Sequence, residues 1–241
     1  MKLLILAYGT LTYVLAMGTI LYMIGFVDCL LVPKNIDMGV PGALPEVILT
    51  NVALVALFGV SHSVMARPAF KERLIKFIPA AAERSTFVLV ASIVFVLLYW
   101  QWRPEGTLLW SFSGAVGVLL FGISMLGWVI VFWSTFLIDH FDLFGMRQVW
   151  LNYRGIEYSA SPFVVRGLYK YVRHPLMLGF LLAFWSAPIM TLGHLLFAIA
   201  MTVYILIGVF HEERDLSKSL GESYLQYKEE TSMIVPWRMR G

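Results

Sequence analysis

The feature of this chain that most constrains its fold is a series of apolar runs long enough to cross a lipid bilayer. A helix needs about 20 mostly apolar residues to cross the hydrocarbon core. Runs close to this length or longer lie at residues 3–32, 47–66, 86–102 and 114–138. A further apolar region, residues 176–210, exceeds one crossing and is interrupted by Pro188 and Gly193. We expect this region to form a hairpin of two short helices that turns near residues 187–194.

Composition favours a membrane protein over a soluble one. Of the 241 residues, 59% are hydrophobic and 14% are charged, whereas about a quarter of the residues of a soluble protein are charged. We therefore predict an all-α polytopic integral membrane bundle of five to six transmembrane helices, forming one domain over residues 1–241. In this prediction residues 1–138 hold four spans and one basic cytoplasmic loop, residues 139–175 a cytoplasmic segment, residues 176–210 the hairpin, and residues 211–241 a cytoplasmic helical tail.

The positions of Lys and Arg predict the orientation. All but Lys34 and Arg103 of the 18 basic residues fall on one side of the predicted spans. They are Lys2, Arg67, Lys71, Arg73, Lys76, Arg84, Arg147, Arg154, Arg166, Lys170, Arg173, Arg214, Lys218, Lys228, Arg238 and Arg240. Because basic residues accumulate in cytoplasmic loops, we expect an even number of crossings and both termini in the cytoplasm, in a bacterial inner membrane. Topology thus accounts for the basic residues, and no nucleic-acid partner is expected.

Several classes of site are not expected from this sequence. Cys29 is the single cysteine, so an internal disulfide and a cysteine-based metal site are excluded. No His and Cys residues stand at metal-binding spacing, and no metal is predicted. A transporter would place polar groups at mid-membrane, but the spans are almost free of charge, and Asp28 lies near a span end. An active site that faces the cytoplasm is favoured over a conduction path.

The start of the predicted hairpin favours binding of an anionic group. Pro175 suits the first position of a helix, where its missing N–H would be unpaired in any case. The free N–H groups of the first turn attract anions, Arg173 can bind a carboxylate with two hydrogen bonds, and His174 adds a donor or acceptor. The alternative is an ordinary basic flank of a span.

The end of the hairpin carries the opposite charge. Glu212 and Glu213 follow the apolar region and could bind an ammonium or lie near a sulfonium, while the ring faces of Tyr224 and Tyr227 could attract such cations. An antiparallel hairpin brings these groups next to the basic start. S-Adenosylmethionine combines a carboxylate, an ammonium and a sulfonium. The alternative for this segment is an ordinary solvated helix.

These motifs carry a resemblance. The pattern R-H-P-x-x-x-G, an apolar hairpin, E-E-x-x-L, G-E-S-Y-L-Q-Y-K and a final Val235-Pro236 resembles the isoprenylcysteine carboxyl methyltransferase and phospholipid methyltransferase superfamily of membrane enzymes. One departure is Met177, where that superfamily often has tyrosine. The resemblance implies that S-adenosylmethionine is the methyl donor. It assigns donor binding to Tyr169, Arg173, His174, Pro175, Gly179, Glu212, Glu213 and Tyr224.

The first half of the chain narrows the resemblance. Residues 61–71, 83–86 and 140–148 are similar to the methanethiol S-methyltransferase family and its nitric-oxide-reductase-associated membrane relatives. That similarity implies methyl transfer to a small thiol, methanethiol, giving dimethyl sulfide. Two other hypotheses stay open: methylation of a lipid acceptor, either a prenylcysteine or a phospholipid, and a non-catalytic assembly or transport protein. The oligomeric state is not predicted.

A thiol acceptor must lose its proton, because the thiolate is the nucleophile. We expect His140 to be the general base and Asp142 to orient it, at the cytoplasmic end of the fourth span. Arg147 would hold the donor or lower the thiol pKa. The acceptor pocket is predicted from His62, Gln148, Trp150 and Tyr153. The alternatives are a polar span end at residues 138–142 and a core histidine at position 62.

Overall fold

The structure, a computed structural model, describes residues 1–237, and these are mostly helical. Arg238 and Arg240, two of the basic residues used above, lie outside the described residues. The chain divides into two compact units. The first unit comprises Met1–Gly106 and Asp139–Pro162, and the second comprises Thr107–Ile138 and Phe163–Gly241.

Within the described residues, five helices are long and apolar enough to span a membrane. They are α1 (Lys2–Val27), α2 (Leu44–Met65), α4 (Glu83–Gln101), α5 (Gly114–Ile138) and α9 (Leu192–Leu220). A shorter apolar helix, α8, covers Pro175–Trp185. The prediction of an all-α integral membrane bundle is therefore confirmed.

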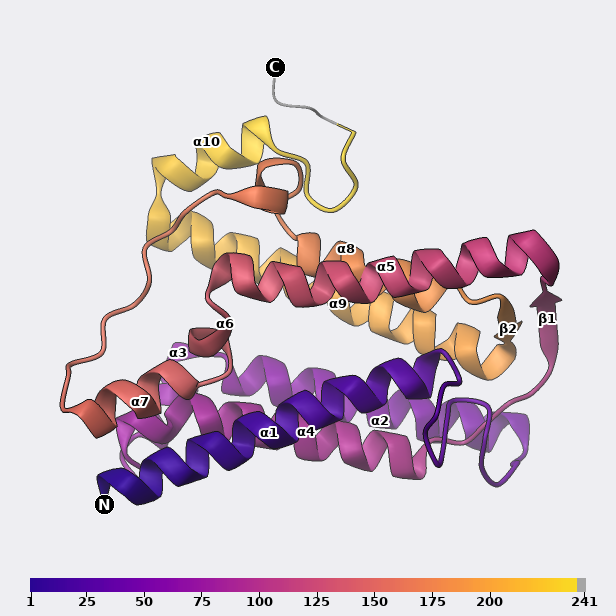
Figure 1. The fold of residues 1–241 in the computed structure, drawn as a ribbon, viewed down its shortest axis with the longest axis horizontal. Helices are drawn as coiled ribbons and strands as arrows, with labels where there is room; N and C mark the ends of the chain where they lie inside the picture. The colour runs from indigo at the N-terminus through magenta and orange to yellow at the C-terminus, as the bar shows by residue number, and fades with distance from the viewer. Residues whose placement is uncertain (238–241) are drawn as a thin grey trace. The chain divides into compact units, whose positions relative to one another are not determined.

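In the first unit, α4 packs against both α1 and α2 (Figure 1). Four short elements complete this unit: α3 (Pro68–Leu74), the 3-10 turn η1 (Ala80–Ala82), α6 (His140–Leu143) and α7 (Met146–Arg154). Helix α7 lies against α1, where a Cβ atom on Gly9 would stand 2.6 Å from the Val149 side chain. The short elements after α5 are thereby held on the first helix of the chain.

The first span is shorter than predicted. The apolar run reaches residue 32, but α1 ends at Val27, with Asp28 as its C-cap. Cys29 and Leu31 take positive φ angles of 56° and 44°, a backbone conformation that cannot continue a right-handed helix. The prediction was wrong at this end because apolar composition reports burial or contact with lipid and does not itself specify a helical backbone. At 26 residues, or about 39 Å, α1 is still long enough to span the core.

In the second unit, α5 and α8 approach until their backbones touch. A Cβ atom added to Gly127 would lie 2.6 Å from the Gly179 carbonyl oxygen, and one added to Gly179 would lie 2.6 Å from the Gly127 carbonyl oxygen. The Ser124 hydroxyl donates to the Ala183 carbonyl oxygen at 3.1 Å. Small residues at such crossings allow close packing and hydrogen bonds between helices in a membrane.

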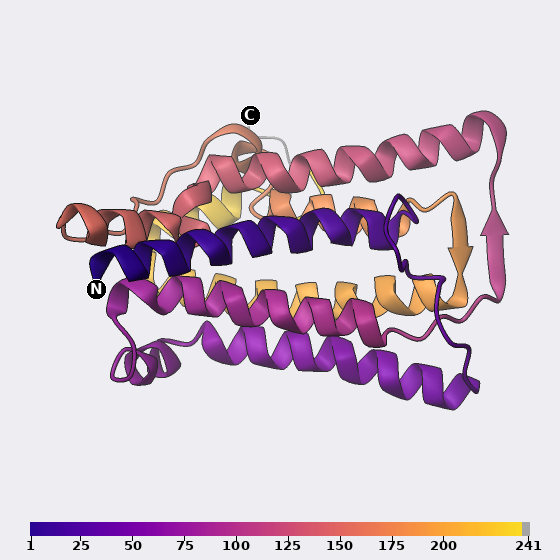
Figure 2. The same ribbon diagram turned by 60° about the horizontal axis from the view of Figure 1, so that its bottom comes forward.

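The apolar hairpin turns within the predicted region. After α8, strand β2 (Ile189–Thr191) pairs antiparallel with β1 (Leu108–Ser111), which precedes α5 (Figure 2). Thr191 then caps α9 by accepting a hydrogen bond from the His194 N–H at 3.1 Å.

The two arms differ from the predicted pair of short helices. Helix α8 has 11 residues, or about 16 Å, whereas α9 has 29 residues and continues through the polar segment to Leu220. The second arm was predicted too short because the apolar run ends near residue 210, although nothing breaks the helix until Gly221, where φ is 60°. A helix α10 (Glu222–Glu230) follows.

Candidate functional site

The two ends of the hairpin meet in the second unit, as an antiparallel hairpin requires. Arg173 Nε lies 2.7 Å from Glu213 Oε1, and His174 Nε2 lies 3.2 Å from the same oxygen. His174 Nδ1 is 3.6 Å from Glu212 Oε2. The structure thus brings together the two charged pairs that the sequence singled out, at a site we call the hairpin mouth (Arg173, His174, Glu212 and Glu213).

Glu213 is the centre of this network. Its side chain is 10% exposed, and besides Arg173 and His174 it contacts Lys228 Nζ at 3.2 Å. Arg173, 9% exposed, also donates to the carbonyl oxygens of Lys228, at 3.0 Å, and Thr231. Burial of an ion pair requires such complete pairing, because an unpaired buried charge is costly. Arg173 and Glu213 therefore join the start of α8 and helix α9 to α10 and to Thr231 after it.

The backbone reinforces the same junction. The N–H of Arg173 donates to the Ser232 carbonyl oxygen at 2.8 Å, and that of His174 to the Met233 carbonyl oxygen at 3.0 Å. Pro175 then begins α8 as a buried residue. The segment between Arg173 and Pro175 is consequently fixed by the chain that follows α10.

Two groups at the hairpin mouth are suited to contact a ligand. Glu212 has a side chain that is 51% exposed, in contrast to Glu213. Thr231 is buried, and its hydroxyl oxygen has no hydrogen-bond partner within the described chain. A buried polar atom without a partner is costly, and a polar group of a bound molecule could satisfy it. Thr231 was not among the predicted site residues.

Aromatic side chains lie at the same end of the second unit. Phe163, Tyr224 and Tyr227 form a group of mutually edge-on rings with centroid distances of 5.7–5.9 Å. The Tyr227 hydroxyl donates to the Tyr169 carbonyl oxygen at 2.6 Å. Burial, and next the charge of Glu212, raises the pKa of Tyr169, while burial and then Glu213 raise the pKa of Tyr224. Both phenols therefore stay protonated and remain hydrogen-bond donors.

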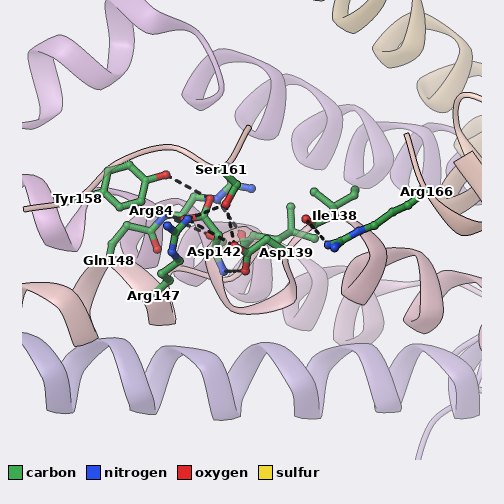
Figure 3. Close-up of polar contacts among 10 residues, drawn as sticks. Arg84, Ile138, Asp139, Asp142, Arg147, Gln148, Tyr158, Ser161 and Arg166 are labelled. Carbon is green, nitrogen blue, oxygen red and sulfur yellow. Dashed lines mark hydrogen bonds and ion pairs between the residues drawn. The ribbon is translucent and has the colours of Figure 1, made fainter. Parts of the chain in front are cut away.

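Of the remaining predicted donor residues, Gly179 lies in the contact between α5 and α8. Its close approach to the Gly127 backbone accounts for a glycine at this position without a ligand. Arg166, another basic residue of this unit, caps the end of α5: its Nε donates to the Leu137 carbonyl oxygen at 2.6 Å and its Nη2 to that of Ile138 at 3.3 Å (Figure 3). Arginine near a helix C-terminus satisfies carbonyl groups in this way.

A second polar cluster lies in the first unit, where α6 meets α7 (Figure 3). Asp139 caps α6, its carboxylate accepting a hydrogen bond from the Asp142 N–H at 3.1 Å. Arg147 Nη1 lies 3.4 Å from Asp139 Oδ2, 3.3 Å from Asp142 Oδ1 and 2.7 Å from Ser161 Oγ. Tyr158 donates to Asp142 Oδ2 at 3.2 Å. The guanidinium of Arg147 is thus paired with two carboxylates and helps to hold residues 158–161 at this corner.

His140 contacts a residue that was not among the predicted site residues. It is buried, 3% exposed, and its Nε2 lies 2.8 Å from the Tyr13 hydroxyl oxygen. The Asp142 carboxylate is hydrogen-bonded to Arg147, Gln148 and Tyr158. Burial lowers the pKa of His140, and the charge of Asp139 opposes this only in part. The imidazole is therefore neutral at pH 7, as a general base must be.

The predicted acceptor-pocket residues lie on two helices of the first unit, α2 and α7. His62 lies on α2 between the rings of Phe58 and Phe87, with centroid distances of 5.3 and 4.7 Å. Trp150 and Tyr153 are exposed residues of α7 whose rings are 6.0 Å apart. Gln148 donates to Asp142, while its buried carbonyl oxygen has no partner within residues 1–237.

Several further participants were missed by the sequence reasoning in this unit, Tyr158 among them. Tyr13 lies in an apolar run and gave no signal, whereas Asp139 and Ser161 stand close to predicted residues and could have been found as further polar side chains near His140. Arg84 donates from Nε to the Leu143 carbonyl oxygen at 2.8 Å and so also supports α6. No group of three or more metal-ligating side chains occurs among residues 1–237.

The comparison with known protein families shows to which family the chain belongs. The profile of the NnrU protein family matches residues 51–238, most of the chain. This chain belongs to the NnrU family. The region matched in this NnrU-family chain contains both the hairpin mouth and the cluster around His140, whereas α1, which carries Tyr13, precedes it.

Curated relatives are similar over nearly the whole NnrU-family chain. Methanethiol S-methyltransferase 2 of Bradyrhizobium diazoefficiens is 52% identical over 98% of this chain and 91% of the relative. Methanethiol S-methyltransferase of Mycobacterium tuberculosis is 46% identical over 97% of this chain and 96% of the relative. Nurim of Xenopus laevis is 26% identical over 97% of this chain and 90% of the relative. No solved structure matches. The resemblance to the methanethiol S-methyltransferase family is confirmed.

Proposed function

We propose that this protein is a membrane methyltransferase that transfers a methyl group from S-adenosylmethionine to methanethiol, giving dimethyl sulfide. The observation that carries the proposal is the identity of 46–52% with proteins named methanethiol S-methyltransferase, over nearly the full length of both chains. The chemistry of the two polar clusters supports it.

The hairpin mouth suits a zwitterionic donor with a sulfonium. Glu212, half exposed, offers a carboxylate to the ammonium of S-adenosylmethionine. The unpartnered Thr231 hydroxyl and the first turn of α8 offer hydrogen-bond donors to its carboxylate. The ring of Tyr169, which is only partly buried, suits a sulfonium, and the buried Tyr224 supports the aromatic group beside it. Arg173, His174, Pro175, Gly179 and Glu213 hold this arrangement in place.

The cluster around His140 suits an acceptor that must lose a proton. A neutral imidazole can accept the thiol proton, and the thiolate then attacks the methyl carbon in line with the departing sulfur. Arg147 offsets one of the two negative charges of Asp139 and Asp142, so that the remaining negative charge can stabilise a positive imidazolium. A small apolar thiol needs no long binding groove. It partitions into the bilayer, and membrane lipid is the protein's other partner.

The donor assignment is tested by calorimetric titration of the purified protein with S-adenosylmethionine. We expect Glu212→Ala to weaken binding while the protein keeps its wild-type unfolding temperature, because the side chain is half exposed. Arg173→Ala should also weaken binding, but with a loss of stability. If both variants bind the donor as wild type does, the hairpin mouth is not the donor site.

The reaction is tested by headspace detection of dimethyl sulfide after methanethiol is added. His140→Ala should lower turnover by about 10²-fold or more with little change in donor affinity. Donor binding without dimethyl sulfide would redirect the assignment to a prenylcysteine or phospholipid acceptor. A folded protein that binds no donor would favour the non-catalytic hypothesis.

The orientation is part of the same proposal. We place the protein in a bacterial inner membrane with both termini in the cytoplasm, on the strength of the Lys and Arg distribution. The pairing of β1 with β2 supports an even number of crossings. It keeps the end of α8 and the start of α9 beside the start of α5, so the short α8 and the residues after it complete one passage.

A further inference from the structure

We propose that Tyr13 is a second proton-transfer residue and that the acceptor thiol loses its proton to His140 through the Tyr13 hydroxyl. This inference rests on the proposed function and deepens it, since it names the group that the thiol meets first. The two residues are 127 positions apart in the sequence. Tyr13 lies in the first span and His140 in the segment that follows the fourth span.

The contact between the two rings is specific. The Tyr13 hydroxyl oxygen and His140 Nε2 are 2.8 Å apart, the distance of a good hydrogen bond. The rings are nearly perpendicular, with an interplanar angle of 85° and centroids 5.7 Å apart. Phe144 packs against both rings, at 4.9 Å from His140 and 6.1 Å from Tyr13. Both side chains are therefore held in the orientation that keeps the hydrogen bond.

Tyr13 and His140 differ in how exposed they are. His140 is 3% exposed, and its Nε2 is directed at the phenol. Tyr13 is only partly buried, so it is the more accessible residue of the pair to a small molecule. A thiol that approached His140 Nε2 directly would have to displace Tyr13, whereas one bound beside the phenol would keep this hydrogen bond.

The transfer balances as a relay of two protons. The thiol S–H bond breaks and its proton goes to the phenol oxygen, while the phenol proton moves to His140 Nε2. The electron pair left on the thiol sulfur then forms the bond to the methyl carbon. The bond between that carbon and the donor sulfur breaks, its electron pair staying on the donor sulfur. The imidazolium, stabilised by Asp139, returns its proton to water.

The test compares Tyr13→Phe with wild type on two thiols, methanethiol and the more acidic trifluoroethanethiol. With methanethiol we expect the variant's kcat to fall by about 10²-fold, with unchanged affinity for S-adenosylmethionine. With trifluoroethanethiol the loss should shrink to less than tenfold, because an ionised acceptor needs no relay. Equal losses with both thiols would show a merely structural role and overturn the proposal, as would an unchanged rate.

Tyr8→Phe is the matched control. Tyr8 lies on the same helix and its hydroxyl makes one hydrogen bond of similar length, 2.9 Å, to Thr86 Oγ1, but none to the imidazole. This variant should keep wild-type kcat on both thiols. A loss in Tyr8→Phe equal to that in Tyr13→Phe would overturn the proposal by assigning both losses to the packing of α1.

A measurement on wild type keeps the test decisive even if Tyr13→Phe fails to fold. In D2O, kcat with methanethiol should fall more than kcat with trifluoroethanethiol, and equal effects would count against a relay. The experiments distinguish a failure of the proposed function from a failure of the Tyr13 proposal. A folded wild-type protein that makes no dimethyl sulfide refutes the proposed function and this inference together, whereas an active enzyme indifferent to the Tyr13 hydroxyl refutes this inference alone.

Discussion

Replacement of Gly127 by alanine tests whether the contact between α5 and α8 is as close as described. The added Cβ atom would lie 2.6 Å from the Gly179 carbonyl oxygen and 2.7 Å from the Ala183 nitrogen. Both atoms belong to backbone, so no side chain can rotate away. Restoring an ordinary contact of about 3.4 Å requires the helices to separate by about 0.8 Å, and a gap of this size loses a quarter to a half of the dispersion energy of the contacts involved.

The expected cost follows from these distances. Overpacking costs about 1–3 kcal/mol, and loss of the hydrogen bond from Ser124 to Ala183 would add about 0.6 kcal/mol in a membrane environment. We expect Gly127→Ala to destabilise the protein by about 1.6–3.6 kcal/mol, which lowers Tm by about 3–14 °C for a chain of this size. Thermal unfolding in detergent measures it.

Gly122→Ala supplies the control for this prediction. It lies on the same helix, and a Cβ atom there meets nothing within 4 Å. Alanine has the higher helix propensity, so this variant should be as stable as wild type or slightly more stable. Equal Tm values for the two variants would refute the close approach of α5 and α8.

Three further predictions address charge, pH and orientation. Glu213→Gln should destabilise the protein by about 3–5 kcal/mol in thermal unfolding, because it leaves the buried Arg173 guanidinium without its carboxylate. Glu212→Gln should cost less than about 1 kcal/mol, because the Glu212 side chain is half exposed. Equal losses in the two variants would contradict a structural role for Glu213 and a ligand-binding role for Glu212. Because burial lowers the pKa of His140 in the folded state, the unfolded chain binds the proton more readily, and stability should decrease as pH falls from the ordinary histidine pKa toward the folded value. Thermal scans across this range should show a weaker pH dependence for His140→Gln, and identical slopes would argue against the shift. In a cysteine-free background, a membrane-impermeant maleimide applied from the periplasm should label Ser113→Cys and spare Ser219→Cys, and the reverse pattern would invert the proposed topology.

The membrane architecture could be predicted from the sequence because long apolar runs are easy to recognise in it. A span needs a long apolar run, and such runs leave little room for a different interpretation. The end of α1 was missed because apolar residues continue past the point where Cys29 and Leu31 leave the helical region. The length of α9 was missed for the converse reason, since polar residues after residue 210 continue the same helix to Leu220.

The contacts of the candidate site could likewise be predicted from the sequence only in part. The meeting of Arg173 and Glu213 could be predicted because a hairpin with one turn brings its own two ends together. The contact of Tyr13 with His140 could not, because nothing local relates a tyrosine in an apolar run to a histidine 127 residues later. The final glycine of the R-H-P-x-x-x-G pattern was interpreted as part of a ligand site, although packing against Gly127 explains it; its partner helix lies outside the motif.

The small ribbon of β1 and β2 determines where this protein tolerates added sequence. Helix α8 is too short to cross the hydrocarbon core, so residues 186–191 continue in non-helical backbone, whose polar groups need partners near lipid. The ribbon supplies them: Phe112 N–H donates to the Pro188 carbonyl oxygen at 2.9 Å, and Leu192 N–H to that of Thr107 at 2.9 Å. A connection between two helices is commonly chosen for an epitope tag or a fused reporter. Here an insertion at Pro188 would separate the strands and leave the backbone amides of Phe112 and Leu192 without these partners, so a reporter belongs elsewhere on the chain.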